Sequence, residues 1–164
     1  MVDEPVSALA LYPGWEAHQN LLIQAIGDLT PDQLAQRTTE RLRNVSETCL
    51  HIIGARARWS RFELGLRDAA LIELGEWDDD GMPVRTAAEL VAGLRATWAP
   101  LREALAGWTP HDLAQTVPNS APAPGEPDVF TRQWIIWHLI EHDIHHAGEI
   151  TEILGTFGLP GLDI

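Results

Sequence analysis

A segment near the C-terminal end of the chain, from Trp134 to Leu154, is apolar at most positions and yet contains four histidines. When it is wound as an α-helix, the apolar residues cover nearly its whole circumference, and such a helix is buried. Buried imidazoles need hydrogen-bond or metal partners. The segment therefore predicts a buried last helix, starting near Asp128 or Thr131 and ending near Gly155, with its polar sector turned to the protein interior.

Helical spacing of apolar residues also dominates the rest of the chain, and strand signals are almost absent. Three more long helices are expected over about 15–27, 44–65 and 86–107. Pro100 is expected to kink or divide the third of them. A Thr-Pro pair at Thr30 predicts a further short helix, because threonine caps a helix and proline suits its first position.

Two parts of the chain are similar to each other: residues 22–36 read LIQAIGDLTPDQLAQ and residues 101–115 read LREALAGWTPHDLAQ, with seven of 15 positions identical. Their offset of 79 residues is too long for a solenoid. It suggests two helix-pair halves, with the second and last long helices facing each other. Chance similarity of two Thr-Pro helix starts is the alternative. The predicted fold is all-α, one four-helix-bundle domain over 1–164 with extra short helices and long loops.

The charge balance excludes several classes of partner. The chain has 24 acidic and 11 basic residues, a net charge of −13, which argues against nucleic acid and against an anionic membrane surface. A single cysteine, Cys49, excludes an internal disulfide and a cysteine-rich zinc site. No apolar run approaches the roughly 18 residues of a membrane span, and the N-terminus lacks a signal-peptide pattern. We expect a cytoplasmic protein.

The histidines of the last helix share one face. With His142 set to zero, His146 lies near +40°, His138 near −40°, His145 near −60° and Glu149 near −20° at about 100° per residue. Two histidines at i and i+4 can hold one divalent ion, and nitrogen ligands suit Zn, Ni, Cu or Fe. A lone interior histidine is usually a hydrogen-bonded core residue, but this grouping favours a metal.

A third ligand is expected from the second long helix, where His51 precedes an apolar stretch. Three histidines would leave one coordination position open, as in catalytic sites. Glu149, Glu47 and Arg58 fall on the histidine faces of their helices and are candidates to contact a ligand or substrate. His18 and His111 lie outside the cluster and are expected at the surface. His138 and His145 belong to the cluster, and either of them could replace one of the three ligands.

Three other features have plainer interpretations. Cys49 is expected to be a buried structural thiol, because it points about 160° away from His51 on a helix. Residues 78–81 resemble a calcium loop but lack its ligand spacing, which favours a solvated loop. Most of the seven tryptophans should fill the core, while Trp59, about two turns beyond His51, is placed to line a pocket above a metal.

The motif HxxxHxxHHxGEI at residues 138–150, together with His51 on an earlier helix, resembles the DinB/YfiT family of metal-dependent proteins. The resemblance covers essentially the whole chain and implies a four-helix bundle, frequently dimeric. It also implies a divalent metal, commonly nickel or zinc, held by one histidine of the second helix and an i, i+4 pair of the last. In this chain those residues are His51, His142 and His146, with His138 one turn earlier as an alternative.

The family's characterised members include a mycothiol-dependent maleylpyruvate isomerase and transferases that use bacillithiol or another low-molecular-weight thiol. In the isomerase the first residue of the i, i+4 pair is Glu, whereas here it is His142. The resemblance therefore implies thiol S-transfer to an electrophilic small molecule, with Glu149 orienting a ligand imidazole and Arg58 binding an anionic group. Alternatives are a non-catalytic metal-binding or stress-response protein and a metal-dependent hydrolase. A homodimer is expected from the apolar circumference of the last helix.

Overall fold

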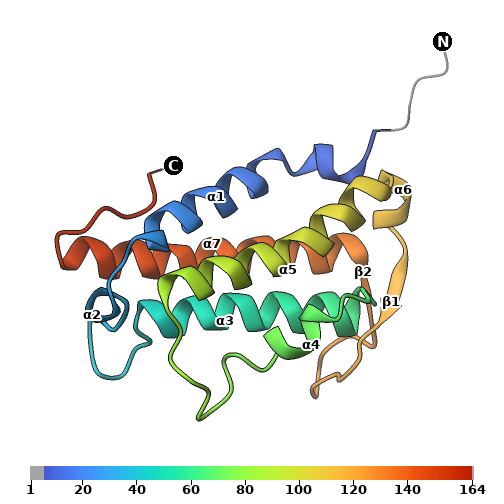
Figure 1. The fold of residues 1–164 in the computed structure, drawn as a ribbon. Helices are drawn as coiled ribbons and strands as arrows, with labels where there is room; N and C mark the ends of the chain where they lie inside the picture. Colours follow the sequence, from blue (N-terminus) through green and yellow to red (C-terminus); the bar gives the residue numbers. More distant parts are fainter. Residues whose placement is uncertain (1–5, 164) are drawn as a thin grey trace.

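Four long helices lie side by side in the computed structural model, which describes residues 6–163 (Figure 1). The predicted all-α four-helix bundle is confirmed. The four helices are listed here with their bounds: α1 (Pro13–Gly27), α3 (Val45–Arg58), α5 (Ala87–Gly107) and α7 (Arg132–Thr156). The short elements between them are η1 (Ala8–Leu11), α2 (Pro31–Leu34), the π-turn η2 (Trp59–Glu63), α4 (Ala70–Leu74), α6 (Pro110–Leu113), β1 (Thr116–Pro118) and β2 (Val129–Thr131).

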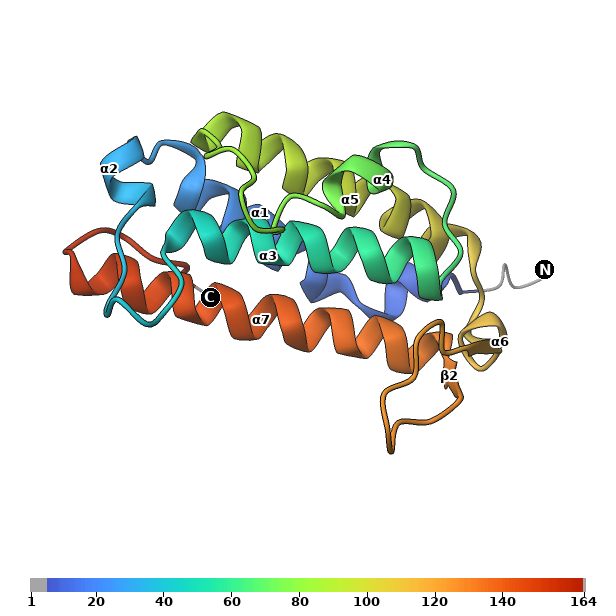
Figure 2. The same cartoon turned by 90° about the horizontal axis from the view of Figure 1, so that it is seen from below.

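Helices α3 and α7 lie against each other in antiparallel directions (Figure 2). From His51 in α3 to Trp59 at the start of η2, the contacts on α7 move back from His146 to His138. Helices α1 and α5 pair antiparallel in the same way. Side chains from α3 and α7 can therefore meet along a shared seam.

The two similar segments fold alike. Thr30 caps α2 and Thr109 caps α6, each accepting a hydrogen bond from the backbone N–H three residues on. The side chains of Gln33 and Asp112 complete the two capping boxes by accepting from the backbone N–H of the threonines. Each half thus runs long helix, short capped helix, loop, long helix, and α3 faces α7 as the internal similarity predicts.

Some boundaries differ from the sequence-based ones. Regular α-helix ends at Arg58 and continues as the π-turn to Glu63, so the second long helix is shorter than expected. Helix α5 runs through Pro100 without being divided. Strands β1 and β2 pair antiparallel over three residues each, and segments this short show no clear alternation of apolar and polar residues in the sequence. Helix α4 also lies in a stretch that was expected to be a loop.

The core has two apolar clusters, one towards α2 and one towards α6. Between them lies a buried polar layer, in which Arg56 and Asp143 have no exposed surface. In it, Arg56 donates through Nε and Nη2 to the carboxylate of Asp143, at 2.8 to 3.0 Å. Trp15 Nε1 donates to the same carboxylate, and Arg56 Nη1 donates to Gln19, whose amide donates to the carbonyl of Leu94. The layer joins all four long helices.

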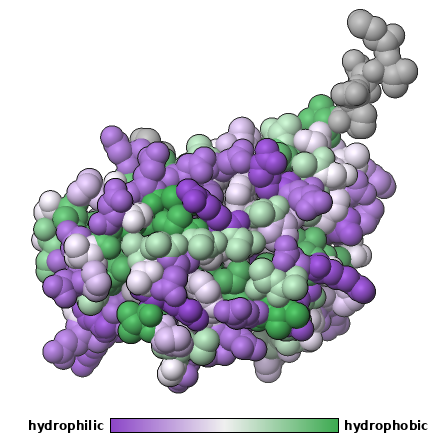
Figure 3. All heavy atoms as spheres, in the orientation of Figure 1, coloured by the Kyte–Doolittle hydropathy of each residue, from purple (hydrophilic) through white to green (hydrophobic). Residues whose placement is uncertain are grey.

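The outer face of α7 departs from the expectation of burial all round. Trp134, Trp137 and Ile144 are 43%, 56% and 50% exposed. The reason is that α7 is covered mainly by α3, and less by α1, α6, η2 and β2, which leaves its outer face open. The face of the molecule shown in Figure 3 carries mostly hydrophilic residues with small hydrophobic groups between them. Within residues 6–163, no helix is long and apolar enough to cross a membrane.

Candidate metal centre

Three histidine side chains meet at the seam between α3 and α7. They are His51 of α3 and the i, i+4 pair His142 and His146 of α7, and one ring nitrogen of each lies within 4.8 Å of the others. Nε2 of His51 and Nε2 of His142 are 3.2 Å apart. Two nitrogen ligands of one tetrahedral zinc ion are about 3.4 Å apart, given zinc–nitrogen bonds of about 2.0–2.1 Å. The three predicted ligand residues are therefore brought together.

A carboxylate fixes the orientation of His51. Its Nδ1 lies 3.0 Å from Oδ2 of Asp78, so Nδ1–H donates to the carboxylate and the lone pair of Nε2 faces the cluster. Arg58 holds Asp78 in turn, through Nη1 at 2.5 Å and Nη2 at 2.9 Å. Burial raises the pKa of the Asp78 carboxyl, but hydrogen bonds from Arg58 and His51 outweigh it and hold that pKa well below its usual range. Asp78 therefore stays ionised beside His51.

A second carboxylate orients His146. Its Nδ1 lies 2.7 Å from Oε2 of Glu149, so this imidazole also presents Nε2 to the cluster. Burial lowers the pKa of His146, against the opposing effect of Glu149. Burial raises the pKa of Glu149, but the hydrogen bond from His146 outweighs this effect. The pKa of Glu149 is therefore below its usual value, and the carboxylate stays ionised.

His142 is held neutral by its surroundings. Burial, and then the neighbouring imidazoles, lower its pKa to about 3. Its Nδ1 is buried, and among the described residues it has no hydrogen-bond partner. The donor set therefore consists of three imidazoles, two of them with Nδ1 engaged by carboxylates and Nε2 turned inward. This set fits a divalent cation, because metals bind neutral imidazole and the carboxylates strengthen the donors.

The other histidines take different places. His138 hydrogen-bonds Glu141 and lies outside the three-histidine group. His145 is exposed and forms a second, surface group with His146 and Glu149. His111 is exposed, as expected, whereas His18 is only 8% exposed, so the prediction of a surface position for it is wrong. The reason is that His18 lies on the inner face of α1, whose apolar spacing is too irregular to mark that face.

The remaining candidates are found in supporting positions. Glu47 completes the capping box of α3 with Asn44 and pairs with Arg37. Both terminal nitrogens of Arg58 are engaged, by Asp78 and by the carbonyl of Gly75. Cys49 is fully buried, and burial raises its thiol pKa to about 12, as expected of a structural cysteine.

Asp78 is the site residue that sequence reasoning missed. Residues 78–81 were expected to form a solvated loop, and Asp79 and Asp80 are indeed exposed, but the Asp78 side chain is only 13% exposed. Its contact with His51 spans 27 residues, so no local spacing indicates it. Gly54 leaves room for it, since a Cβ at this position of α3 would overlap the Asp78 carboxylate.

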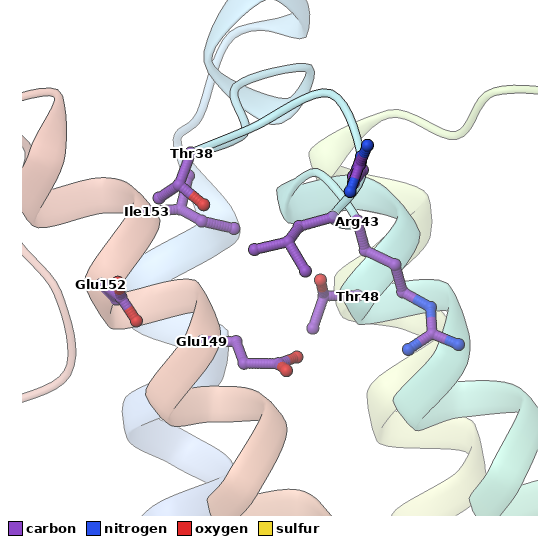
Figure 4. Close-up of a pocket in the computed structure, with 8 residues that line it drawn as sticks. Thr38, Arg43, Thr48, Glu149, Glu152 and Ile153 are labelled. Carbon is purple, nitrogen blue, oxygen red and sulfur yellow. The ribbon is translucent and has the colours of Figure 1, made fainter.

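Two cavities adjoin the cluster. One, of about 290 Å³, is lined by His51, Asp78 and Arg43 among others. The other, of about 440 Å³, lies between the C-terminal part of α7 and the start of α3. Figure 4 shows Glu149 of α7 pointing towards Thr48 of α3 across this second cavity. Arg43 lines both cavities, the smaller of which includes His51 and the larger Glu149, the partner of His146.

The chain is similar to known proteins in sequence and in fold. A sequence model of the DinB family matches residues 4–162. The crystal structure of a DinB-like protein from Bacillus cereus ATCC 10987 superimposes with a TM-score of 0.72 and covers 93% of each chain at 22% identity, a likeness that shows a shared fold. A search of curated proteins finds no significant match.

Proposed function

The chain belongs to the DinB family, and we propose that it is a divalent-metal-dependent enzyme that transfers a low-molecular-weight thiol to an electrophilic small molecule. The observation that carries the proposal is the convergence of His51, His142 and His146 at one point beside two cavities. Three neutral ligands would leave the charge of a divalent ion uncompensated and a coordination position open, which would suit catalysis more than storage.

Each of the protein groups has a role in this proposal. The three imidazoles would hold the cation, which is zinc or nickel in this proposal because both suit a nitrogen donor set. When bound, the cation supplies Lewis acidity that lowers the pKa of a thiol binding beside it. Asp78 and Glu149 keep two of the imidazoles in the correct tautomer and orientation. Arg58 is a positioning residue, because it acts on His51 through Asp78.

Arg43 is better placed than Arg58 to bind an anionic group of the thiol. Low-molecular-weight thiols commonly carry carboxylates, which guanidinium groups bind well. The Arg43 side chain is exposed, lines both cavities, and makes no ion pair with any described residue. Arg58, in contrast, already pairs with Asp78.

The proposed reaction is a substitution that needs no oxidant or reductant. The thiol loses its proton to solvent, and its sulfur donates an electron pair to an electrophilic carbon of the substrate. A carbon–sulfur bond forms, and the leaving group departs with the electron pair of the bond that breaks. The role of the protein is to hold the sulfur and the carbon within reach of each other.

The experiment uses purified protein loaded with Zn²⁺ and, in parallel, protein treated with a chelator. Both are melted in the presence of glutathione, coenzyme A, cysteine, bacillithiol or mycothiol. We expect at least one thiol to raise the melting temperature of the loaded protein only, because a ligand that binds the folded state stabilises it. If no thiol of this panel stabilises the loaded form, the transferase proposal is rejected.

A further inference from the structure

A third cavity, of about 260 Å³, lies next to the histidine cluster towards the N-terminal end of α7. Its walls are mainly aromatic, and they include Trp59, which was expected to line a pocket above a metal, and His138 of the last-helix motif. The lining residues used in the argument are Trp59, Phe130, Trp134, His138, Glu63 and Glu126.

The aromatic rings form a continuous wall. Phe130 stacks on Trp134 with ring centres 4.2 Å apart and planes 9° apart, and Trp134 stacks on His138 at 5.2 Å and 7°. Trp59 packs against His138 from α3's side at 4.5 Å. Because each ring is held by its neighbours, the wall is already in place for a flat molecule to lie against.

The cavity is built by an irregular piece of backbone. Helix α3 passes into the π-turn at Trp59, and π-turns of this kind are often found at functional sites. Glu63 of the same turn accepts hydrogen bonds from the backbone N–H and the hydroxyl of Ser120. These bonds fasten the loop over residues 119–127 to the turn, and the loop forms the opposite wall.

The cavity is also connected to the histidine cluster. His138 lines it, and the His138 ring lies 6.3 Å from the ring of His142, measured between centres. A molecule against the aromatic wall would therefore lie within about one helical turn of the proposed metal ligands.

The charge of the lining limits what can bind. Glu63 and Glu126 contribute carboxylates, and the described residues that line the cavity include no Arg or Lys. A negatively charged molecule would be repelled here, whereas the cavity beside Glu149 contains Arg41 and Arg43. The two ends of the histidine row thus differ in chemistry, aromatic and acidic at one end and partly basic at the other.

We propose that the aromatic cavity binds the electrophile, and that this electrophile is an aromatic or flat conjugated molecule without negative charge. The identification as the electrophile site rests on the proposed thiol-transfer function. A volume of about 260 Å³ lies just below the range of about 300–1,000 Å³ typical of small-molecule sites, and it suits one ring or two fused rings.

The test measures binding of 4-nitrobenzyl alcohol and 4-nitrobenzoate by equilibrium dialysis, in metal-loaded and in chelator-treated protein. The neutral alcohol is expected to bind saturably in both, and the carboxylate at least about tenfold more weakly. Trp134→Ala removes a ring of the wall, and Ala121→Trp fills the cavity from the loop. Trp134→Ala is expected to weaken binding of the alcohol by about tenfold, the effect of losing one good aromatic contact. Ala121→Trp is expected to weaken it by at least about tenfold, because the new ring takes the place of the alcohol.

Phe157→Ala is the control, because Phe157 is an exposed aromatic residue at the C-terminal end of the same helix and lies outside the cavity, and it should bind the alcohol as the wild type does. Wild-type binding by both cavity variants, or equal binding of the carboxylate, overturns the inference even if metal and thiol binding are intact. If the dialysis gives the expected results but no thiol stabilises the metal-loaded protein, the proposed transferase function is rejected and the aromatic binding site is kept.

Discussion

At the scale of single residues, two carboxylates decide how the histidines are presented. A motif in the sequence indicates that histidines share a helix face, but it does not say which ring nitrogen points inward. Asp78 and Glu149 each take the Nδ1–H of one histidine, which leaves Nε2 for the cluster. Glu149 could be predicted because it lies three residues after His146 on one helix, whereas Asp78 reaches His51 from a separate loop.

Asp78→Asn tests the role of this carboxylate. The amide is nearly the same size but lacks the charge that supports the His51 imidazole and pairs with Arg58. Loss of such a supporting carboxylate typically weakens metal binding by about 10–100-fold. Zn²⁺ affinity measured by competition with a chelator should fall by that factor. Asp79→Asn, at an exposed neighbour, is the control, and equal affinity of both variants and the wild type would contradict the assignment.

Gly54 gives a prediction opposite in sign to helix propensity. In an exposed helix interior, alanine is more stable than glycine by about 1 kcal/mol. At Gly54 a Cβ would overlap the Asp78 carboxylate, so Gly54→Ala should lower both the melting temperature and Zn²⁺ affinity. Gly148→Ala in α7, where nothing lies within 4 Å of a new Cβ, should be neutral or stabilising. A stabilised Gly54→Ala protein with unchanged affinity would show that the contact is not needed.

At the scale of elements, the long helices and their capped starts followed from local patterns. Capping boxes at Thr30, Thr86 and Thr109 are encoded within four residues, so they could be predicted. The short helix α4 and the three-residue strands β1 and β2 could not, because their formation depends on packing against distant parts of the chain. The same holds for the buried pair of Arg56 and Asp143.

That buried pair determines how the helices fit together. Removing one partner of a fully buried ion pair leaves an unpaired charge and costs about 3–5 kcal/mol. We expect Asp143→Ala to lower the free energy of unfolding in urea by that amount, because Arg56 and Trp15 both lose their acceptor. Glu16→Ala breaks the exposed pair with Arg102 and should cost less than about 1 kcal/mol. Similar losses in the two variants would mean that the polar layer contributes little.

At the scale of the whole molecule, the grouping of His51, His142 and His146 could be predicted and its surroundings could not. The pair His142 and His146 is a local helical spacing, and His51 follows from an apolar stretch on the helix that faces it. The cavities, the position of Arg43 and the engagement of Arg58 by Asp78 depend on loops between the helices. Sequence patterns do not define where such loops pass.

The exposed apolar side chains of α7 lead to a proposal about assembly. On its outer face, Trp137 is 56% exposed and Ile144 is 50% exposed. Exposed apolar groups of this kind favour a symmetric interface between two copies. Light scattering at micromolar concentration should show a dimer for the wild type and a monomer for Ile144→Arg. Val84→Arg, at an exposed loop position, should leave the dimer intact. A monomeric wild type would contradict this proposal.

The most direct test of the central claim is the metal stoichiometry of histidine variants. After loading with Zn²⁺ and gel filtration, the wild type and His111→Ala should each retain about one ion per chain, as expected of a site with one set of three ligands. His51→Ala, His142→Ala and His146→Ala should retain almost none, while circular dichroism shows an intact helical fold. Full metal occupancy in the His51→Ala protein would contradict the claim that α3 and α7 together hold the ion.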